Sequence, residues 1–133
     1  MAKKIHKFPW DPLVGKQAPN GRIATIIYYG PTAALATKVA VSVLEGDDPD
    51  SRVQLEIQKW FSDTLDIRRS HLINKKIIAF LRTYQVYSVL MRADKLMGCP
   101  HEEAIDYPEG EACPHCPYWQ GRDRFTHELV DEA

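Results

Sequence analysis

The stretch that most constrains this chain runs from Cys99 to Cys116, because it gathers most of the residues that could hold a soft metal ion. It contains all three cysteines and two of the five histidines in the 133-residue sequence. Cys113 and Cys116 form a Cys-x-x-Cys turn, a spacing that lets two sulfurs converge on one ion. Pro114 favours such a turn because its ring presets the backbone dihedral. The pair Cys99 and His101 forms a second half-site.

Zinc is the ion that these residues predict, because zinc usually takes four thiolate or imidazole ligands in a tetrahedron. The simplest ligand set uses every cysteine and one histidine: Cys99, His101, Cys113 and Cys116. Two alternatives stay open for the fourth position. His115 could replace His101, or a carboxylate of Glu102 or Glu103 could fill the place.

The residues between the two half-sites, 102–112, are rich in Glu, Asp, Pro and Gly. Such a segment can loop back on itself but cannot build an apolar core. We therefore expect metal binding to supply the free energy that orders this part of the chain, as in small zinc modules. Three thiolates and one imidazole would close the shell, which predicts a structural zinc of the knuckle type.

A catalytic zinc is the main alternative. In that arrangement His101 and two cysteines would hold the ion, and the fourth position would carry a water. Glu102 or Glu103 would then act as the general base for zinc-dependent hydrolysis. The sequence shows no Ser-His-Asp arrangement and no phosphate-binding glycine loop that would support other chemistry.

The segment Cys113-Pro-His-Cys116 also resembles the active-site motif of the disulfide-forming branch of the thioredoxin family. The resemblance covers four residues and implies a thiol-disulfide oxidoreductase, with the first cysteine activated at a helix N-terminus. In that family the motif follows an early strand and opens a long helix, with a large domain downstream. Here Pro117 follows the motif at once and only residues 117–133 remain, so we expect metal binding rather than redox chemistry.

The length of the chain suits one domain with one core. The formal net charge is −1, so no overall field favours nucleic acid. The basic start of the sequence is not followed by an apolar signal region, and no apolar run is long enough to span a membrane. An odd number of cysteines without an export signal predicts a cytoplasmic protein with reduced thiols.

Three strands are predicted in the first half of the chain. Residues 22–29 are rich in Ile and Tyr, and residues 37–44 and 53–58 alternate apolar and polar side chains. Short breaks connect the three strands, which predicts an antiparallel meander. The irregular arm before them, residues 1–21, contains three prolines and an apolar set that we expect to pack on the domain: Phe8, Trp10, Leu13 and Val14.

The apolar period then changes to that of a helix, over residues 70–84, with Ser70 or Asn74 as its cap. Residues 85–91 contain Val and Tyr at positions that favour extended chain, which predicts a fourth strand. A second helix over 85–91, giving a helix-turn-helix, is the alternative.

Two charged regions could bind ligands. Asp47, Asp48 and Asp50 form an acidic turn that resembles part of a calcium loop, but the required glutamate is absent, so we expect a solvated hairpin turn. The middle of the chain is basic and could grip phosphate; its cations are Arg68, Arg69, Lys75, Lys76, Arg82, Arg92 and Lys95. We expect these cations to be solvated or neutralised by the acidic tail.

Tyr118 and Trp119 are expected to pack on the metal turn rather than stack on a base.

The sequence therefore predicts an α+β domain: a three-stranded antiparallel meander, one amphipathic helix, a fourth strand and a zinc-stabilised irregular C-terminal segment. The parts are an arm over 1–21, a sheet-and-helix body over 22–95 and a metal-binding tail over 96–133. The expected function is that of a small binding or assembly module, not an enzyme and with no catalytic residues. Its partner would be a protein or a nucleic acid and not a membrane.

Overall fold

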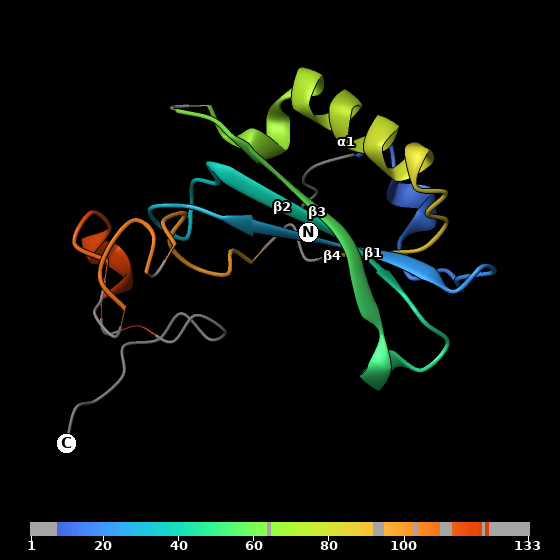
Figure 1. The fold of residues 1–133 in the computed structure, drawn as a ribbon. Coiled ribbons are helices and arrows are strands. Elements are labelled where there is room, and N and C mark those ends of the chain that lie inside the picture. The colour runs from blue at the N-terminus through green and yellow to red at the C-terminus, as the bar shows by residue number, and fades with distance from the viewer. Residues whose placement is uncertain are drawn as a thin grey trace.

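Four strands and one α-helix form the body of the protein in this computed structural model (Figure 1), which describes residues 8–63, 65–91, 95–102, 104–109, 113–120 and 122. In chain order the elements are β1 (Arg22–Tyr29), β2 (Lys38–Glu45), β3 (Val53–Phe61), α1 (His71–Thr83) and β4 (Val89–Met91). The predicted α+β class is confirmed.

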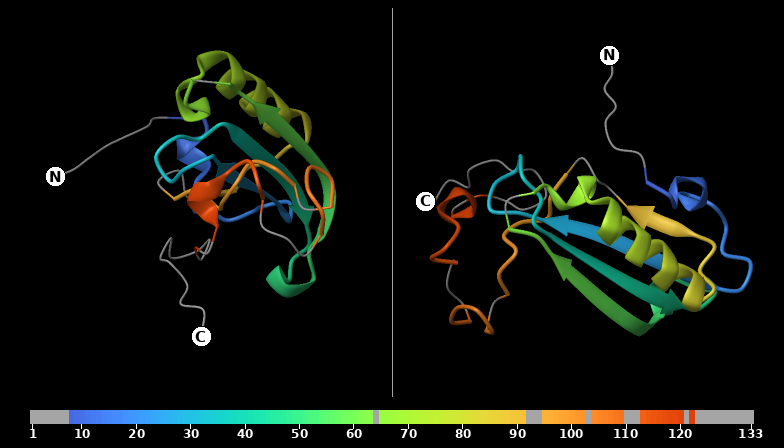
Figure 2. Two further views of the ribbon diagram at one scale, coloured as in Figure 1. Left: turned by 90° about the vertical axis from the view of Figure 1, so that its left-hand side faces the viewer. Right: turned by 90° about the horizontal axis from the view of Figure 1, so that it is seen from above.

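The strands form one mixed sheet in the order β3-β2-β1-β4. β1 pairs antiparallel with β2 from Arg22 opposite Glu45 to Tyr29 opposite Lys38, and β2 pairs antiparallel with β3. The predicted meander is therefore confirmed. β4 pairs parallel with β1 at the other edge. Since β3 and β4 run in the same direction at opposite edges, α1 forms the crossover and lies over one face of the sheet (Figure 2).

The core lies between α1 and the covered face of the sheet. Alternate residues of β1 and β2 point into it, as the predicted two-residue period requires. The strand residues of the core are Ala24, Ile26, Tyr28, Val39, Val41 and Val43, each at most 1% exposed. From α1, Ile77 and Leu81 are fully buried against them. The N-terminal arm completes this core, because Trp10 is fully buried and stacks on Phe8 with ring centroids 4.9 Å apart.

Both ends of α1 are fixed by local hydrogen bonds. The Ser70 hydroxyl accepts from the backbone N–H of Ile73 at 3.1 Å, so Ser70 is the N-cap. At the other end the N–H of Val86 donates to Leu81 and the N–H of Gln85 donates to Arg82. These two bonds define a Schellman motif with Gln85 in the left-handed region, at φ +56°.

The fourth strand is shorter than the sequence predicted. Strand pairing covers Val89–Met91, not 85–91, because Gln85 and Val86 are used to terminate α1. The helix-turn-helix alternative is wrong, since the residues described after α1 up to Met91 form a turn and a strand.

Two of the charged features have local structural roles. The Asp48 side chain accepts from the N–H of Asp50 at 3.0 Å, which caps the short 3-10 turn Pro49–Ser51 between β2 and β3. Arg68, predicted to be part of a solvated basic region, is instead 9% exposed and pairs with Asp66 at 2.6 Å. The Arg68 guanidinium is therefore part of the packed structure.

Candidate metal centre

Three cysteines and one histidine from the C-terminal segment come together beside one end of the sheet. They are Cys99, His101, Cys113 and Cys116, and one potential ligand atom from each lies within 4.8 Å of the others. Among the described residues, no other cluster of His, Cys, Asp or Glu forms such a group. The two half-sites that were recognised in the sequence thus converge on one point.

The Nδ1 atom of His101 lies close to all three sulfurs of this group. It lies 3.2 Å from the sulfur of Cys99 and 3.4 Å from each of the sulfurs of Cys113 and Cys116. One imidazole nitrogen has either one lone pair or one hydrogen, so it cannot bond three thiols at once. A tetrahedral ion with zinc-like bond lengths would separate nitrogen and sulfur ligands by about 3.6 Å. The observed distances therefore fit four donors arranged around one metal ion.

Tight turns bring the donors of each half-site together. The N–H of His101 donates to the Cys99 sulfur at 3.2 Å, which closes the first turn. Gly98, just before it, has φ +133°, a conformation that side chains rarely permit. In the second half-site the side-chain amide of Gln120 donates to the carbonyl of Cys113 at 3.0 Å.

Glu102 fastens the first half-site to the sheet. Its carboxylate accepts from Lys59 of β3 at 2.6 Å and from Lys38 of β2 at 3.1 Å. Lys38 also donates to the carbonyl of Pro100 at 3.1 Å, and its side chain is only 5% exposed. Hydrogen bonds from Lys59 and Lys38 lower the pKa of the Glu102 carboxyl. Glu102 is therefore an ionised anchor.

The end of β1 anchors both halves of the segment. The N–H of Met97 donates to the carbonyl of Tyr28, and the N–H of Gly30 donates to the carbonyl of Gly98. The indole N–H of Trp119 donates to the carbonyl of Gly30 at 2.6 Å. Gly30 must be glycine, because a Cβ there would overlap the carbonyl oxygen of Leu35.

The sulfurs are shielded from solvent. Cys113 is 6% exposed and Cys116 2% exposed, while Cys99 is half-buried. Burial raises the pKa of the thiols of Cys99 and Cys116. A bound cation would reverse this effect, because the metal ligand is the thiolate.

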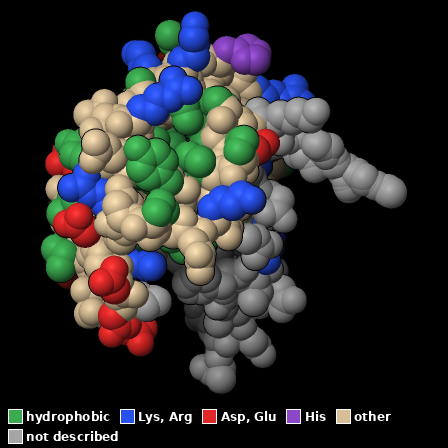
Figure 3. Space-filling model, turned by 90° about the vertical axis from the view of Figure 1, so that its right-hand side faces the viewer, with side chains coloured by type: hydrophobic (Ala, Val, Ile, Leu, Met, Phe, Trp, Pro, Cys, Tyr) green, Lys and Arg blue, Asp and Glu red, His purple; other side chains and the backbone are tan. Residues whose placement is uncertain are grey.

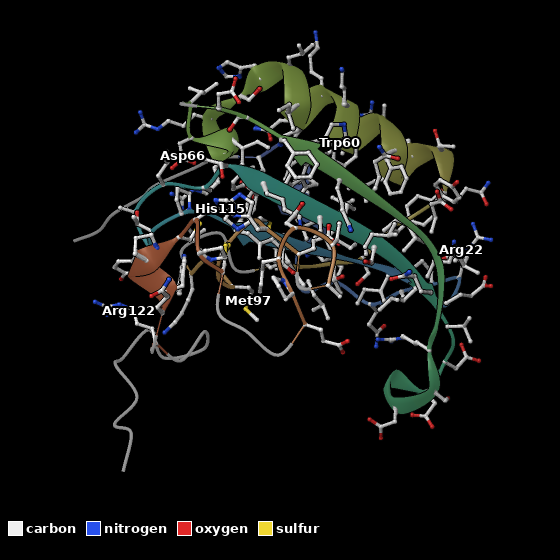
Figure 4. The ribbon with its side chains drawn as sticks, turned by 60° about the vertical axis from the view of Figure 1, so that its left-hand side comes forward. Arg22, Trp60, Asp66, Met97, His115 and Arg122 are labelled. Atoms are coloured by element: carbon white, nitrogen blue, oxygen red, sulfur yellow. The ribbon has the colours of Figure 1, made fainter. Side chains whose placement is uncertain are left out.

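The alternative ligands are placed differently. His115 is exposed and lies outside the group, with its ring centroid 5.1 Å from that of His101. Figure 4 shows His115 and Arg122 in the C-terminal segment beside the end of the sheet. Arg122 lies over the Tyr118 ring at 4.2 Å, and Trp119 packs against the main apolar core. Packing of these two aromatic residues on the metal turn stays a prediction. Glu103 lies outside the described residues.

The anchoring residues could not be read from the sequence. Lys38 and Lys59 stand in strands with no spacing that links them to the cysteines, and only the register of β2 and β3 places both beside Glu102. Gly30 gave a partial signal, because a glycine followed by proline marks the end of a strand.

No family model, curated protein or solved structure matches this chain. Among the described residues, no helix has the length and apolar character that crossing a membrane requires. The chemistry of the Cys3His group is therefore the basis for a functional assignment.

Proposed function

We propose that the protein is a small binding or assembly module whose C-terminal segment is held in place by a structural zinc ion. The observation that carries the proposal is the approach of one imidazole nitrogen to three sulfurs at 3.2–3.4 Å. Soft thiolates and an imidazole in a tetrahedral arrangement suit zinc. The ligands in this proposal are Cys99, His101 through Nδ1, Cys113 and Cys116.

A structural role is favoured over hydrolysis for two reasons. Four protein donors fill a tetrahedral shell, so no position is left for a water. The carboxylate nearest to the site in sequence, Glu102, is held by Lys38 and Lys59, which removes it from the role of general base. This arrangement supports a closed centre that fixes a loop segment to the sheet.

A redox role for Cys113 and Cys116 is less well supported. Activation of the first cysteine in the thioredoxin-like motif depends on the N-terminus of a long helix. Here the cysteines are followed by a three-residue 3-10 helix, Pro117–Trp119, and both sulfurs approach His101 together with a third thiol. A Cys3His zinc centre also requires reduced thiols, so we propose that the protein works in a reducing compartment such as the cytoplasm.

Metal analysis and X-ray absorption on protein purified without chelator test the proposal. We expect about one zinc per chain, with three sulfurs at about 2.3 Å and one nitrogen at about 2.0–2.1 Å. The variant His115→Ala serves as the matched control and should retain the metal, whereas His101→Ala should lose most of it. Two sulfurs, one nitrogen and one exchangeable oxygen would favour a catalytic zinc. Three freely titrating thiols and no metal would refute both zinc proposals.

A further inference from the structure

Residues of the N-terminal arm, of α1 and of the turn after it line an apolar groove. The arm and the C-terminal end of α1 lie at the end of the sheet away from the C-terminal segment (Figure 1). Pro9, Pro12 and Leu13 form one wall, and Ile78, Val86 and Tyr87 contribute to the other. The groove has a volume of about 340 Å³, and Tyr87 is 50% exposed at its side. A hollow of this size and lining can accept one or two large apolar side chains.

Cations border this groove. Arg82 is the one charged residue that lines it, and Lys75 lies on the same face of α1, because positions 75, 78 and 82 are separated by three and four residues. Figure 3 shows this side of the molecule: hydrophobic side chains gather at its centre, with several Lys and Arg and a few Asp and Glu side chains around them.

No acid within α1 balances these charges, since the helix contains Lys75, Lys76 and Arg82 but neither Asp nor Glu. Among the described residues, neither Lys75 nor Arg82 forms an ion pair. Asp11 is the acid in the facing wall, and its carboxylate accepts from the backbone N–H of Phe8 at 3.0 Å. The groove thus combines an apolar floor with two cations of α1, Lys75 and Arg82, against one acid, Asp11, in the N-terminal arm.

We propose that this groove binds an acidic amphipathic segment of a partner protein. The apolar side chains of the segment enter the groove, and its carboxylates pair with Lys75 and Arg82. The inference rests on the proposed binding role and names its partner class, but it does not depend on the metal. A nucleic acid fits less well, because phosphate recognition needs several cations in a row. Here a single cation lines a predominantly apolar surface.

The test uses the full-length protein loaded with zinc. The probe is a labelled synthetic peptide of about four helical turns, with Leu and Phe at helical spacing and Glu elsewhere. Anisotropy should show saturable binding that weakens with added salt, since ion pairs contribute. In NMR spectra the largest shift changes should fall on Leu13, Ile78 and Tyr87. Peptides with Lys in place of Glu, or with the same residues scrambled, should not bind.

Two variants on one helix provide a matched pair. The double variant Lys75→Glu with Arg82→Glu should raise the Kd about tenfold or more, because two attractions become repulsions. Lys76→Glu should change it less than about twofold. Lys76 lies on the other flank of α1, on the side of Phe80. The ring centroids of Phe80 and of Trp60 in β3 are 5.9 Å apart, so this flank faces β3 and not the groove. Tyr87→Ser tests the apolar contact and should also weaken binding.

Several outcomes would overturn the proposal: no saturable binding, equal loss in Lys76→Glu, or shift changes confined to other surfaces. Preferential binding of an oligonucleotide that is lost in the double charge reversal would assign the groove to nucleic acid instead. Zinc content is measured on every sample. Loss of peptide binding with full zinc content therefore counts against the groove, and absence of zinc with intact peptide binding counts against the metal proposal.

Discussion

At the scale of single residues, a buried lysine links the sheet to the segment that carries the Cys3His group. Lys38 belongs to β2, yet its ammonium group bonds both the Pro100 carbonyl and the Glu102 carboxylate. These two acceptors flank His101 in the chain. Lys38 therefore orients the first half-site without being a ligand, in the way that supporting groups around metal ligands generally act.

We expect Lys38→Met to weaken zinc affinity about tenfold, a typical effect of removing a group that orients metal ligands. Methionine keeps most of the apolar stem, so packing changes little. Affinity is measured by competition with a chromogenic chelator. Lys59→Met is the matched control, because Lys59 bonds Glu102 alone and is 35% exposed. Equal effects of the two changes would contradict this role for Lys38.

A second residue-scale prediction concerns the buried pair of Asp66 and Arg68. Burial alone would raise the pKa of Asp66, but hydrogen bonds from the side chain and backbone of Arg68 lower it below the usual value. The carboxylate therefore stabilises the fold at pH values above the unfolded-state pKa, and this contribution is lost as the pH falls through the lower folded-state pKa.

Asp66→Asn should lower the free energy of unfolding at pH 7 by about 3 kcal/mol, because it removes the negative charge that pairs with the buried guanidinium of Arg68. Urea denaturation measures the difference. The gap between the variant and the parent should shrink below about pH 4, where the parent carboxyl is protonated in the unfolded state. A gap that stays constant to pH 2 would show that the charge of Asp66 is not the cause.

The residues of the Cys3His group were recognisable from sequence, because thiols and imidazoles that recur at turn spacings are typical of metal sites. The sequence did not show that His101 rather than His115 joins the three cysteines, since both histidines stand close to a cysteine in the chain. It depends on which ring faces the converging sulfurs once the segment has folded back. Lys38 and Lys59 were missed for the same reason, because pairing across β2 and β3 decides their neighbours.

At the scale of elements, the end of α1 contains a conformation that its sequence does not favour. Gln85 occupies the left-handed position of the Schellman motif, where glycine is usual and other residues are strained by about 1–2 kcal/mol. Gln85→Gly should therefore raise the free energy of unfolding by about 0.5–1 kcal/mol, after the greater freedom of glycine in the unfolded chain is subtracted.

Thermal or urea denaturation measures this gain. Gln85→Ala is the control, since alanine removes the side chain but keeps the strained Cβ, so it should give no gain. Thr83→Gly, in the last turn of α1, should instead lower stability by about 0.3 kcal/mol, the difference in helix propensity between threonine and glycine. If alanine stabilised the protein as much as glycine, the side chain of Gln85 and not its backbone angle would be responsible.

Local sequence patterns were sufficient to predict that four strands and one helix exist, but not the bounds of β4 or its pairing with β1. Alternation predicted β2 and β3, because large apolar residues stand at every second position, Val39, Val41 and Val43 in one and Val53, Leu55 and Ile57 in the other. It did not predict that Val53, Leu55 and Ile57 of β3 are exposed, at 63%, 39% and 38%. Residues 53–58 of this edge strand are exposed on both faces of the sheet, and alternation along the chain does not show how far other elements cover a strand. The parallel pairing of β4 with β1 likewise follows from the crossover of α1.

At the scale of the whole molecule, the two proposed sites occupy opposite ends of the sheet (Figure 1). Residues of α1 and of the N-terminal arm line the groove. The Cys3His group consists of Cys99, His101, Cys113 and Cys116 in the C-terminal segment. The C-terminal part of the chain adds little to the apolar core. Among the described residues that follow β4, Leu96 is the one that is fully buried in the main apolar cluster. The two ends therefore depend on different sources of stability.

Metal removal should separate these two parts of the molecule. In hydrogen exchange, chelation should remove protection at the backbone N–H groups of Met97 and Trp119, because the segment lacks a core of its own. Amides of β1, β2 and α1 should keep theirs, since the apolar cluster between sheet and helix includes none of the three cysteines. Zinc at 1,000 times its Kd should add about 4 kcal/mol to the stability of the segment that binds it.

The variant Cys116→Ala should reproduce the effect of chelation without chelator, which controls for removal of metal from elsewhere. The exposed Cys-turn residue Pro114, changed to Ala, should leave protection close to that of the parent. Because the Gly30 and Met97 bonds join the segment to the end of β1, some loss of protection should reach Gly30, but it should stop there. Cooperative unfolding of the entire sheet on chelation would mean that the metal holds the whole domain together. Unchanged exchange in residues 97–120 would mean that the segment orders itself without metal.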